Sequence, residues 1–592
     1  MKKLFTFLII LLLCHSSFSQ GGAYAFLDIN NIKARINANG NQFRDLNGMP
    51  VFEVPKGLNK HTIYNSTLWI GGLDSTDALY ISAERSSLSN SDYTYGPLSV
   101  DGLLYTDQQT IDDYNRVWLV NRLQVEGHIA WANNPSANPT YTIPADILEW
   151  PAHGDLSKNQ SYNLAPYVDV NGNGVYEPHL GDYPQIRGDR CAFFIFNDAG
   201  IPNTESGGTP LGIEVHAMAY AIDCPQSYAF DHTIFMYYKI FNRSQRDYYE
   251  TYMGLYVDFD IGYPWDDYIG CDVERGSIFG YNGIDVDGSG GFDHYGINPP
   301  AQSLTILGGP FMATDGTDNP KYSIVVDPVT GDTLYVQNCD ESINGMNFGN
   351  GIIDDERLGL TGFIAPPIIL PWGVNLEDVF FYNALKTLKY EGSPFLYGGY
   401  GPECKFLYPG DSDPCNWGTG GQLPNGPAYW TEETSGNEPS DKRGLASLGP
   451  FTFTAGSAHM LDFAFVYGRD TAGVYSSIDA MKANIDTIRS CFFSNMNPCG
   501  VPIINSVNSH LSPEETLFRI YPNPAEDILH VETNSPDMFS FQIFDLTGRC
   551  IIESHKNIQL AYVDVSNLKT GMYVIRINSE SQLKTFRFVK TE

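Results

Sequence analysis

The sequence predicts a mainly β protein. Short apolar runs recur along the chain between turn signals, whereas few stretches repeat with the helical spacing of three and four residues. The 592 residues include 13% aromatics and 57 glycines, and only 18% are charged, which is typical of a folded, loop-rich β protein rather than a disordered chain. We expect a large β-rich region with few helices, followed by a C-terminal immunoglobulin-like β-sandwich.

The N-terminus predicts a secretory signal peptide over residues 1–19. Met1-Lys2-Lys3 precede an apolar core from Leu4 to Leu13, and a short polar stretch ends at Ser19, where cleavage is expected. A lipoprotein signal ending at Cys14 is disfavoured because Leu13 is bulky where that cleavage needs a small residue. No later run approaches the roughly 18 apolar residues that span a bilayer, so we expect no transmembrane segment.

The first part of the main region predicts strands at 67–73 and 77–82. Asn121 is placed to cap a helix from Arg122 to about Ala132, and Pro144 to open a short one through Leu148 to Trp150. The proline-bounded segment that begins at Trp150 is a possible internal boundary near residues 151–165.

The middle of the chain contains the clearest core strands, at 192–196, 212–222 and 232–241. Both faces of 212–222 are apolar, which predicts a strand covered on both sides. Glycine-aspartate loops are expected from there to about Leu360. Further elements are a helix at 376–390 with a stripe of Val379, Tyr382 and Leu385, strands at 449–454 and 459–467, a helix at 477–492, and a linker at 501–516.

The last 76 residues, 517–592, read as a separate β domain of seven strands. Phe539, Phe541 and Ile543 alternate with polar residues, and glycines such as Gly548 and Gly571 stand at the turns. The expected strands are 518–521, 528–533, 539–544, 550–554, 558–565, 572–577 and 583–589.

Three motifs of this tail, Tyr521-Pro522-Asn523-Pro524, Phe544 to Arg549 and Leu568-x-x-Gly571-x-Tyr573, resemble the type A sorting domain of the Bacteroidota type IX secretion system. An ordinary immunoglobulin-like binding module is the alternative. The resemblance implies export across the outer membrane, recognition by the secretion machinery and its surface peptidase, and then release or attachment to surface lipopolysaccharide. The residues that would carry the sorting signal are Tyr521, Pro522, Asn523, Pro524, Gly548, Gly571 and Tyr573. Residues 20–500 are then the cargo region.

Charge and cysteine content limit the partners of the cargo region. A net charge of -34 repels nucleic acid and anionic membranes and favours cations. The cargo region has eight cysteines, an even number that suits disulfides in an oxidising compartment, with unpaired buried thiols as the alternative. The expected local pairs are Cys404 with Cys415 and Cys491 with Cys499. No C-x-x-C occurs, which removes the strongest zinc or redox signature.

Two loops share the first part of an EF-hand-type calcium loop, with oxygen ligands at positions 1, 3, 5 and 9 and glycine at position 6. Both lack the acid at position 12, so Asp182 or another segment must supply the remaining ligands of the calcium ion. We expect weak structural calcium binding, at about 10⁻⁴ to 10⁻³ M, with solvated turns as the alternative. The expected metal ligands are Asp169, Asn171, Asn173 and Glu177 in one loop, and Asp285, Asp287, Ser289 and Asp293 in the other.

A dense acidic run lies between these loops, at Asp258-x-Asp260, Asp266-Asp267 and Asp272-x-Glu274. Paired carboxylates can hydrolyse glycosides, and nearby Tyr256, Tyr263, Trp265 and Tyr268 could stack on sugars. Metal ligation or solvated turns are the alternatives. Glu214-x-His216 and Asp231-His232 could meet in space, although hydrogen-bonded core histidines are the simpler expectation.

No H-E-x-x-H or G-x-S-x-G motif occurs, and no catalytic residues are assigned. The cargo region also contains short sequence motifs, such as Trp150 to Asp155 and Gly349 to Asp354, that resemble those of long secreted Bacteroidota proteins with the same tail. This resemblance implies no activity. We therefore expect a calcium-stabilised adhesion, matrix or binding protein, with surface lipopolysaccharide or glycans as possible partners. The alternative is a secreted hydrolase that acts on polysaccharide.

Overall fold

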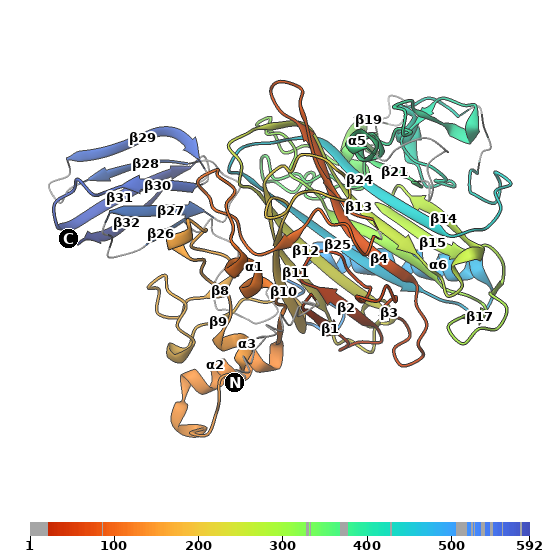
Figure 1. The fold of residues 1–592 in the computed structure, drawn as a ribbon. Coiled ribbons are helices and arrows are strands. Elements are labelled where there is room, and N and C mark those ends of the chain that lie inside the picture. The colour runs from red at the N-terminus through yellow and green to blue at the C-terminus, as the bar shows by residue number, and fades with distance from the viewer. Residues whose placement is uncertain are drawn as a thin grey trace, which may run out of the picture.

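The computed structural model describes residues 22–591 apart from 86, 327–330, 332, 367–376, 425, 427–428, 505–517, 522–524, 526, 534–538, 545–548, 559 and 580–582. The expected signal peptide at 1–19 therefore lies outside the described residues. Strands arranged in antiparallel sheets dominate the described chain, which confirms the mainly β prediction (Figure 1).

A nine-stranded antiparallel sheet forms the centre of the cargo region. Its strand order is β14-β15-β18-β25-β12-β11-β10-β6, and β7 also pairs with β10. The strands span Asp267–Asp272 (β14), Ser277–Asn282 (β15), Ala301–Gly308 (β18), Ala458–Gly468 (β25), Thr233–Asn242 (β12), Ile213–Ala221 (β11), Arg190–Asn197 (β10), Thr94–Tyr95 (β6) and Trp118–Asn121 (β7).

A five-stranded sheet covers one face of this central sheet. Its order is β21-β24-β13-β4-β5, and a three-stranded sheet, β1-β2-β3, adds to the same core. The strands are Gly362–Ile364 (β21), Lys442–Phe453 (β24), Tyr248–Phe259 (β13), Ile63–Leu73 (β4), Leu79–Ala83 (β5), Tyr24–Leu27 (β1), Lys33–Asn37 (β2) and Phe52–Glu53 (β3). Four two-stranded hairpins are β8 Tyr167–Val168 with β9 Tyr183–Pro184, β16 Val286–Asp287 with β17 Gly296–Ile297, β19 Tyr322–Val326 with β20 Thr333–Gln337, and β22 Phe395–Leu396 with β23 Glu403–Cys404.

Alternate residues of β10 belong to two different cores, which explains why this strand is apolar on both faces. Ala192, Phe194 and Phe196 pack in the core between the two large sheets. Phe193 and Ile195 point to the other face and pack in a second core with the helices. β11 is buried along its whole length, as its sequence predicted.

Helices cover the second face of the central sheet. α6 spans Val474–Phe493 and buries Met481, Ile485 and Ile488 at the expected helical spacing. α2 spans Arg122–Asn133, and the Gln124 side chain accepts a hydrogen bond of 2.8 Å from the backbone of Asn121, as in a capping box. The remaining α-helices are α1 Gln108–Tyr114, α3 Ala145–Leu148, α4 Tyr228–Asp231 and α5 Asp378–Leu385.

Two expectations for the cargo elements are wrong. The helix expected at 376–390 ends at Leu385, because Thr387 takes a left-handed backbone with φ 58°, and Val379 is exposed rather than in the apolar stripe. The stretch from 242 to 360, expected as loops, contains β13, β14, β15 and β18, which lie within the two large sheets. Their glycines and aspartates resemble loop residues in the sequence.

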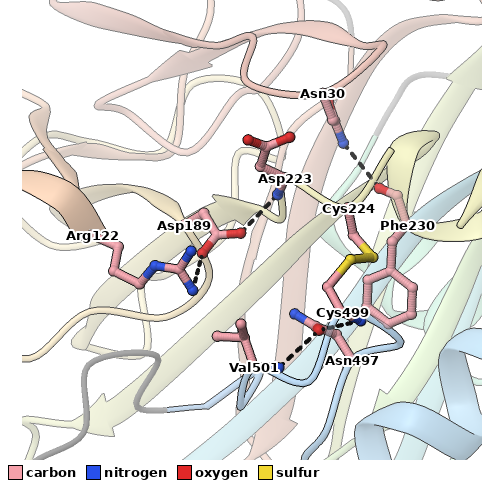
Figure 2. Close-up of a disulfide and its surroundings, with 9 residues drawn as sticks. All are labelled: Asn30, Arg122, Asp189, Asp223, Cys224, Phe230, Asn497, Cys499 and Val501. Carbon is pink, nitrogen blue, oxygen red and sulfur yellow. Dashed lines mark hydrogen bonds and ion pairs between the residues drawn. A yellow bond between two sulfur atoms is a disulfide. The ribbon is translucent and has the colours of Figure 1, made fainter. Parts of the chain in front are cut away.

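The expected local disulfides are also wrong. Cys224 pairs with Cys499 across 275 residues, and Cys339 pairs with Cys415, whereas Cys404 and Cys491 are free. Figure 2 shows the Cys224–Cys499 disulfide, which joins the segment after β11 to the segment after α6. Asn497 holds the turn at Cys499, because its side-chain oxygen accepts from the backbone N–H groups of Cys499 (2.9 Å) and Val501 (3.1 Å).

The proposed internal boundary and the linker adjoin packed segments. Trp150 lies 5.1 Å from Phe193, centroid to centroid, in the helical core, and the boundary near 151–165 stays a prediction. At the start of the linker, Ile503 is fully buried and its carbonyl accepts from the backbone N–H of Gly188 at 3.1 Å. Residues 505–516 of the linker lie outside the described residues.

The tail forms two antiparallel sheets with a core of their own. All seven expected strands are present, although several are longer or shorter than expected by a few residues (Figure 1, blue). The sheets have the orders β26-β27-β30 and β29-β28-β31-β32, and buried residues of both sheets form one cluster. The strands are Phe518–Tyr521 (β26), Ile528–Thr533 (β27), Phe539–Phe544 (β28), Cys550–Ile558 (β29), Leu560–Asp564 (β30), Gly571–Ser579 (β31) and Leu583–Lys590 (β32).

Candidate functional site

The loop from Asp169 to Glu177, called the first acidic loop below, brings its four expected ligands together. The carboxylate of Asp169 accepts from the backbone N–H groups of Gly172 (2.7 Å) and Gly174 (2.6 Å), two glycines with positive φ. Both amide side chains of the loop, Asn171 and Asn173, donate to Oε2 of Glu177, at 3.4 and 2.6 Å. The loop is thus folded around its own oxygen-bearing side chains.

Asp182 adds a buried carboxylate to this loop. It is fully buried and accepts from the backbone N–H groups of Val170 (2.8 Å) and Glu177 (2.7 Å). Burial raises the pKa of Asp182, and the nearby charges of Asp169 and Glu177 raise it further. Three carboxylates and two amide side chains thus belong to this loop, and oxygens are the donors that Ca²⁺ prefers. The carboxylates of Asp169, Glu177 and Asp182 do not lie within 4.8 Å of one another.

The loop from Asp285 to Asp293, the second acidic loop, holds its expected ligands apart. Asp287 is buried and accepts from the backbone N–H groups of Tyr263 (2.8 Å) and Tyr295. Asp285 instead faces the start of α6, where it accepts from the Val474 N–H at 3.2 Å. Ser289 and Asp293 are exposed in the turn between β16 and β17.

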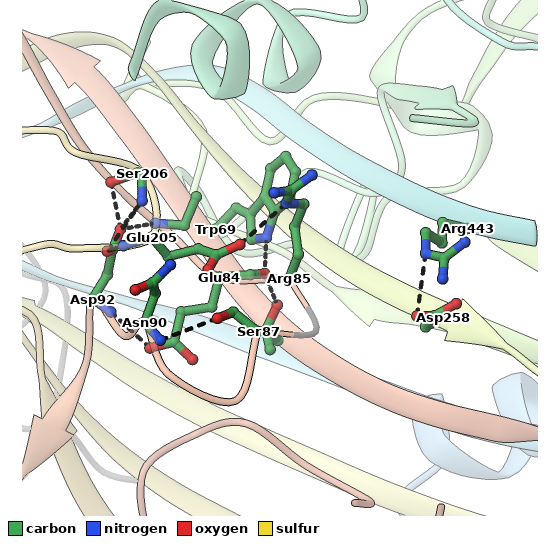
Figure 3. A network of polar contacts seen from close by, with 12 residues as sticks. Trp69, Glu84, Arg85, Ser87, Asn90, Asp92, Glu205, Ser206, Asp258 and Arg443 are labelled. Atoms are coloured by element: carbon green, nitrogen blue, oxygen red, sulfur yellow. Dashed lines mark hydrogen bonds and ion pairs between the residues drawn. The ribbon is translucent and has the colours of Figure 1, made fainter. Parts of the chain in front are cut away.

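Asp258 and Asp260 meet a third acid, Asp441, that the sequence pattern did not associate with them. One carboxylate oxygen from each lies within 4.8 Å of the others. Arg443 joins the group, with Nε 3.2 Å from Oδ2 of Asp258 (Figure 3). Its Nη1 lies 2.9 Å from Oδ1 of Asp441. Burial raises the pKa of Asp258 to about 7, although Arg443 acts in the opposite direction.

Asp267 lies near this group, since burial together with the charge of Asp260 raises the pKa of Asp267, whereas the rest of the acidic run lies elsewhere. Asp267 accepts from the Ile261 N–H at 2.9 Å, and Asp272 forms ion pairs with Arg275 (3.1 Å) and Lys482 (3.3 Å). The nearby aromatics also separate: Tyr256 stacks on Trp69 in the core, whereas Trp265 is 59% exposed. The run does not line one cleft.

Glu214 and His216 form a buried network, as expected for a core histidine. His216 Nε2 lies 2.7 Å from Glu214 Oε1, and Arg243 Nη2 donates to the same oxygen at 2.6 Å. Burial acts to raise the pKa of Glu214, but Arg243 and His216 together lower it to about 2. His232 does not join this network: His216 pairs with Lys239 across the sheet, roughly 20 Å along β12 from His232.

An aromatic pocket opens beside β14, β15 and α6. It is small: about 40 Å³ is accessible to the centre of a water molecule, and the 460 Å³ of space between its lining atoms includes open solvent. Tyr429 and Tyr475 are 51% and 54% exposed at its rim, whereas Tyr281 is buried. The Tyr475 hydroxyl donates to Oε2 of Glu433. The lining includes Phe279, Tyr281, Tyr408, Tyr429 and Tyr475, with Asp411, Glu433 and Lys482 as its charged members.

Sequence reasoning missed this pocket. Its tyrosines come from segments as far apart as Tyr281 and Tyr475, and no motif joins them. In a chain with 37 tyrosines, only the strand pairing of the central sheet reveals which rings meet.

The tail places some of the expected sorting residues in its strands. Tyr521 is the last residue of β26, and Gly571 and Tyr573 begin β31. The Tyr573 hydroxyl donates to the Lys569 carbonyl at 2.8 Å, and its ring stacks on Phe588 with centroids 5.6 Å apart. Pro522, Asn523, Pro524 and Gly548 lie outside the described residues.

The structure is a large β-rich region followed by a C-terminal β domain with a core of its own. Residues 519–591 match the family described as secretion system C-terminal sorting domain. The chain is a cargo protein of the type IX secretion system, and it is secreted or attached to the cell surface. Its tail interacts with the machinery of that system.

Other comparisons add little to this result. No curated protein matches the chain. A polysaccharide lyase aligns at 9% identity and a TM-score of 0.17, over 73% of this chain and 43% of that chain. PorZ, a surface component of the type IX secretion system of Porphyromonas gingivalis, aligns at 10% identity and a TM-score of 0.12, over 96% of this chain and 75% of that chain. No helix among the described residues has the length and apolar character needed to cross a membrane.

Proposed function

We propose that the cargo region is a calcium-stabilised adhesion or binding protein whose ligand site is the aromatic pocket. The observation that carries this proposal is the set of five aromatic side chains around one partly open cavity, with acidic and basic groups at its edge. Binding sites combine apolar and aromatic walls with a few polar groups that fix orientation. Tyr429 and Tyr475 are each about half exposed, and exposed aromatic rings suit stacking on the sugar rings of surface glycans or lipopolysaccharide.

Binding of glycans tests this proposal. The purified full chain is titrated with surface lipopolysaccharide and with a panel of polysaccharides, and Kd is measured by surface plasmon resonance. Tyr429→Ala and Tyr475→Ala should each weaken binding by about tenfold, because each removes an aromatic wall of the site. Tyr105→Ala is the control, since Tyr105 is 55% exposed and outside the pocket. Equal effects of all three substitutions, or no binding of any glycan, would contradict the proposal.

A secreted hydrolase that acts on polysaccharide is the second candidate. Asp411 and Glu433 both line the pocket, and a pair of carboxylates at a sugar site is the requirement for glycoside hydrolysis. Release of reducing ends from a bound polysaccharide distinguishes the two candidates. Loss of that release in Glu433→Gln, with binding retained, would favour the enzyme over the binding protein.

Calcium at the first acidic loop is the stabilising part of the proposal. Asp169, Glu177 and Asp182 supply carboxylates, and Asn171 and Asn173 supply neutral oxygens. A cation there would offset the repulsion that Asp182 experiences from its neighbours. Added calcium should therefore raise the Tm of the EDTA-treated chain, and the part of that rise that disappears in Asp169→Asn belongs to this loop. A Tm that responds neither to EDTA nor to calcium would contradict it.

A further inference from the structure

Three carboxylates from two neighbouring strands meet inside the cargo region. Asp258 is in β13, Asp260 follows the end of that strand, and Asp441 precedes β24. The strands are antiparallel neighbours with Asp258 opposite Arg443, so the three acids gather at the same strand ends. Their nearest oxygens lie within 4.8 Å of one another. Oxygens that share one Ca²⁺, each about 2.4 Å from it, are separated by at most about 4.8 Å.

Asp258 holds a buried oxygen that no hydrogen bond satisfies. The residue is 1% exposed, and its Oδ2 is paired with Arg443, as Figure 3 shows. Its Oδ1 has no hydrogen-bond partner among the described residues. Buried polar atoms are normally paired, because leaving one without a partner destabilises the fold. The described part of the chain therefore supplies no ligand for this oxygen.

The local charge favours a cation. Three carboxylates face one directly paired guanidinium, that of Arg443, which contacts both Asp258 and Asp441. The charge of Arg44 also acts on Asp258, and the Arg44 Nη2 donates to the Ser87 carbonyl. The pairs with Arg443 leave two negative charges in excess, the charge that one divalent cation balances.

Asn65 offers a neutral oxygen beside these acids. It lies opposite Asp258 on β4, and paired residues of neighbouring strands share a face of the sheet. The Asn65 Nδ2 group donates to Asn41 Oδ1 (3.0 Å) and to the Arg85 carbonyl (2.9 Å). Its own Oδ1 is buried and has no hydrogen-bond partner among the residues described.

We propose that Asp258, Asp260 and Asp441 bind one divalent cation of the oxygen-preferring class, with Ca²⁺ as the first choice, and that this ion joins β13 to β24. Carboxylate and amide oxygens are the donors of such ions, and the chain offers no sulfur or imidazole within this group. The site is separate from both the aromatic pocket and the first acidic loop, so it stands whether or not the proposed binding function holds.

Counting bound ions tests the site. The full chain is stripped with EDTA and dialysed against CaCl₂, and calcium per chain is measured by atomic emission. Asp260→Asn should lower the count by one ion, both in the wild-type chain and in an Asp169→Asn background, where the first acidic loop is already impaired. An unchanged count in both backgrounds overturns the proposal. The same count made with MgCl₂ shows which ion the site prefers.

Stability measured with and without calcium gives an independent result. In EDTA, Asp260→Asn should have the higher Tm, because the amide removes repulsion among the three acids. In calcium the order should reverse by a few degrees, because only the wild-type chain holds the ion. Asp441→Asn serves as the second variant and should show the same reversal. If both variants are more stable than the wild type in calcium as well as in EDTA, the three acids only repel and the proposal fails.

Discussion

His459 shows how burial makes one residue sensitive to pH. Its Nδ1 accepts from the Phe311 N–H at 3.1 Å, and the rings of Phe451 and Phe453 lie 4.7 and 5.2 Å from it, centroid to centroid. Burial lowers its pKa to about 4. The accepting nitrogen must stay unprotonated for the hydrogen bond to persist, so the folded chain holds this histidine neutral.

Acidification should therefore destabilise the cargo region. The ordinary pKa of about 6.5 applies to the unfolded chain, so between pH 6.5 and 4 the unfolded state binds a proton that the folded state does not. This stability is fully present above pH 6.5, and about 2 kcal/mol of it should be lost between pH 7 and pH 5. Urea unfolding at both pH values measures the loss. His459→Gln keeps an acceptor for Phe311 but does not titrate, so an equally steep pH dependence in this variant would contradict the assignment.

Contacts between residues could be predicted from the sequence where the residues lie close together on one strand. Glu214 and His216 alternate on an apolar strand, and both are buried in the network that this spacing indicates. Asp441 could not be linked to Asp258 in advance, because only the pairing of β13 with β24 brings them together. The same holds for the tyrosines of the pocket.

At the scale of elements, strands with two apolar faces were predictable, whereas β15 was not. β10, β11 and β12 appear in the sequence as continuous apolar runs. β15 contains Gly280, whose missing side chain lets Phe259 approach: a Cβ there would lie 2.8 Å from Phe259 Cβ and Cγ. Glycine in such a strand marks close packing between sheets rather than a loop.

Two glycine substitutions should therefore have opposite effects. Gly280→Ala should destabilise the chain by about 1 to 3 kcal/mol, because Phe259 is held by its backbone and has little room to move. Gly127→Ala should stabilise it by about 0.5 to 1 kcal/mol, because Gly127 is inside α2 and its Cβ would meet nothing within 4 Å. Thermal unfolding of both variants checks the signs. A shift in the same direction for both would contradict this explanation.

The Cys224–Cys499 bond acts on the whole molecule. It closes 275 residues into one loop, so it removes much of the freedom of the unfolded chain. Replacement of both cysteines by serine should lower the free energy of unfolding by about 3 to 5 kcal/mol. Cys550→Ser is the control, since Cys550 is a free, exposed thiol in the tail and its change should leave stability unaltered. Equal stability of all three proteins would contradict the assigned pairing.

The tail should decide where the protein is found. A chain lacking residues 517–592 should remain in the periplasm, whereas the full chain should reach the cell surface or medium. Cell fractionation measures this, and mass spectrometry of both ends of the exported protein identifies its cleavage sites. Fusion of the tail to an unrelated periplasmic protein is the complementary control and should lead to export. Normal export of the truncated chain would contradict the role of the tail.

For the whole molecule, the sequence predicted export of the protein better than it predicted the fold of the cargo region. The tail has its turns and strands within 76 residues, so short-range patterns define it. The cargo region is held together by partners far apart in the chain, such as β12 with β25 and Cys224 with Cys499. No local pattern reveals such pairs, which is why adjacent cysteines were wrongly joined.

The position of Cys499 also has a mechanical consequence. A pull on the tail reaches the cargo region through residues 500–504. There the Ile504 N–H donates to Asn495 Oδ1 at 2.8 Å and the Gly188 N–H donates to the Ile503 carbonyl at 3.1 Å, so this short stretch bears the load first. Beyond it the tension meets the covalent link, which passes it to Cys224 beside β11 in the middle of the central sheet. Traction on the tail during export is thus carried first by these hydrogen bonds and then by the covalent link to the central sheet.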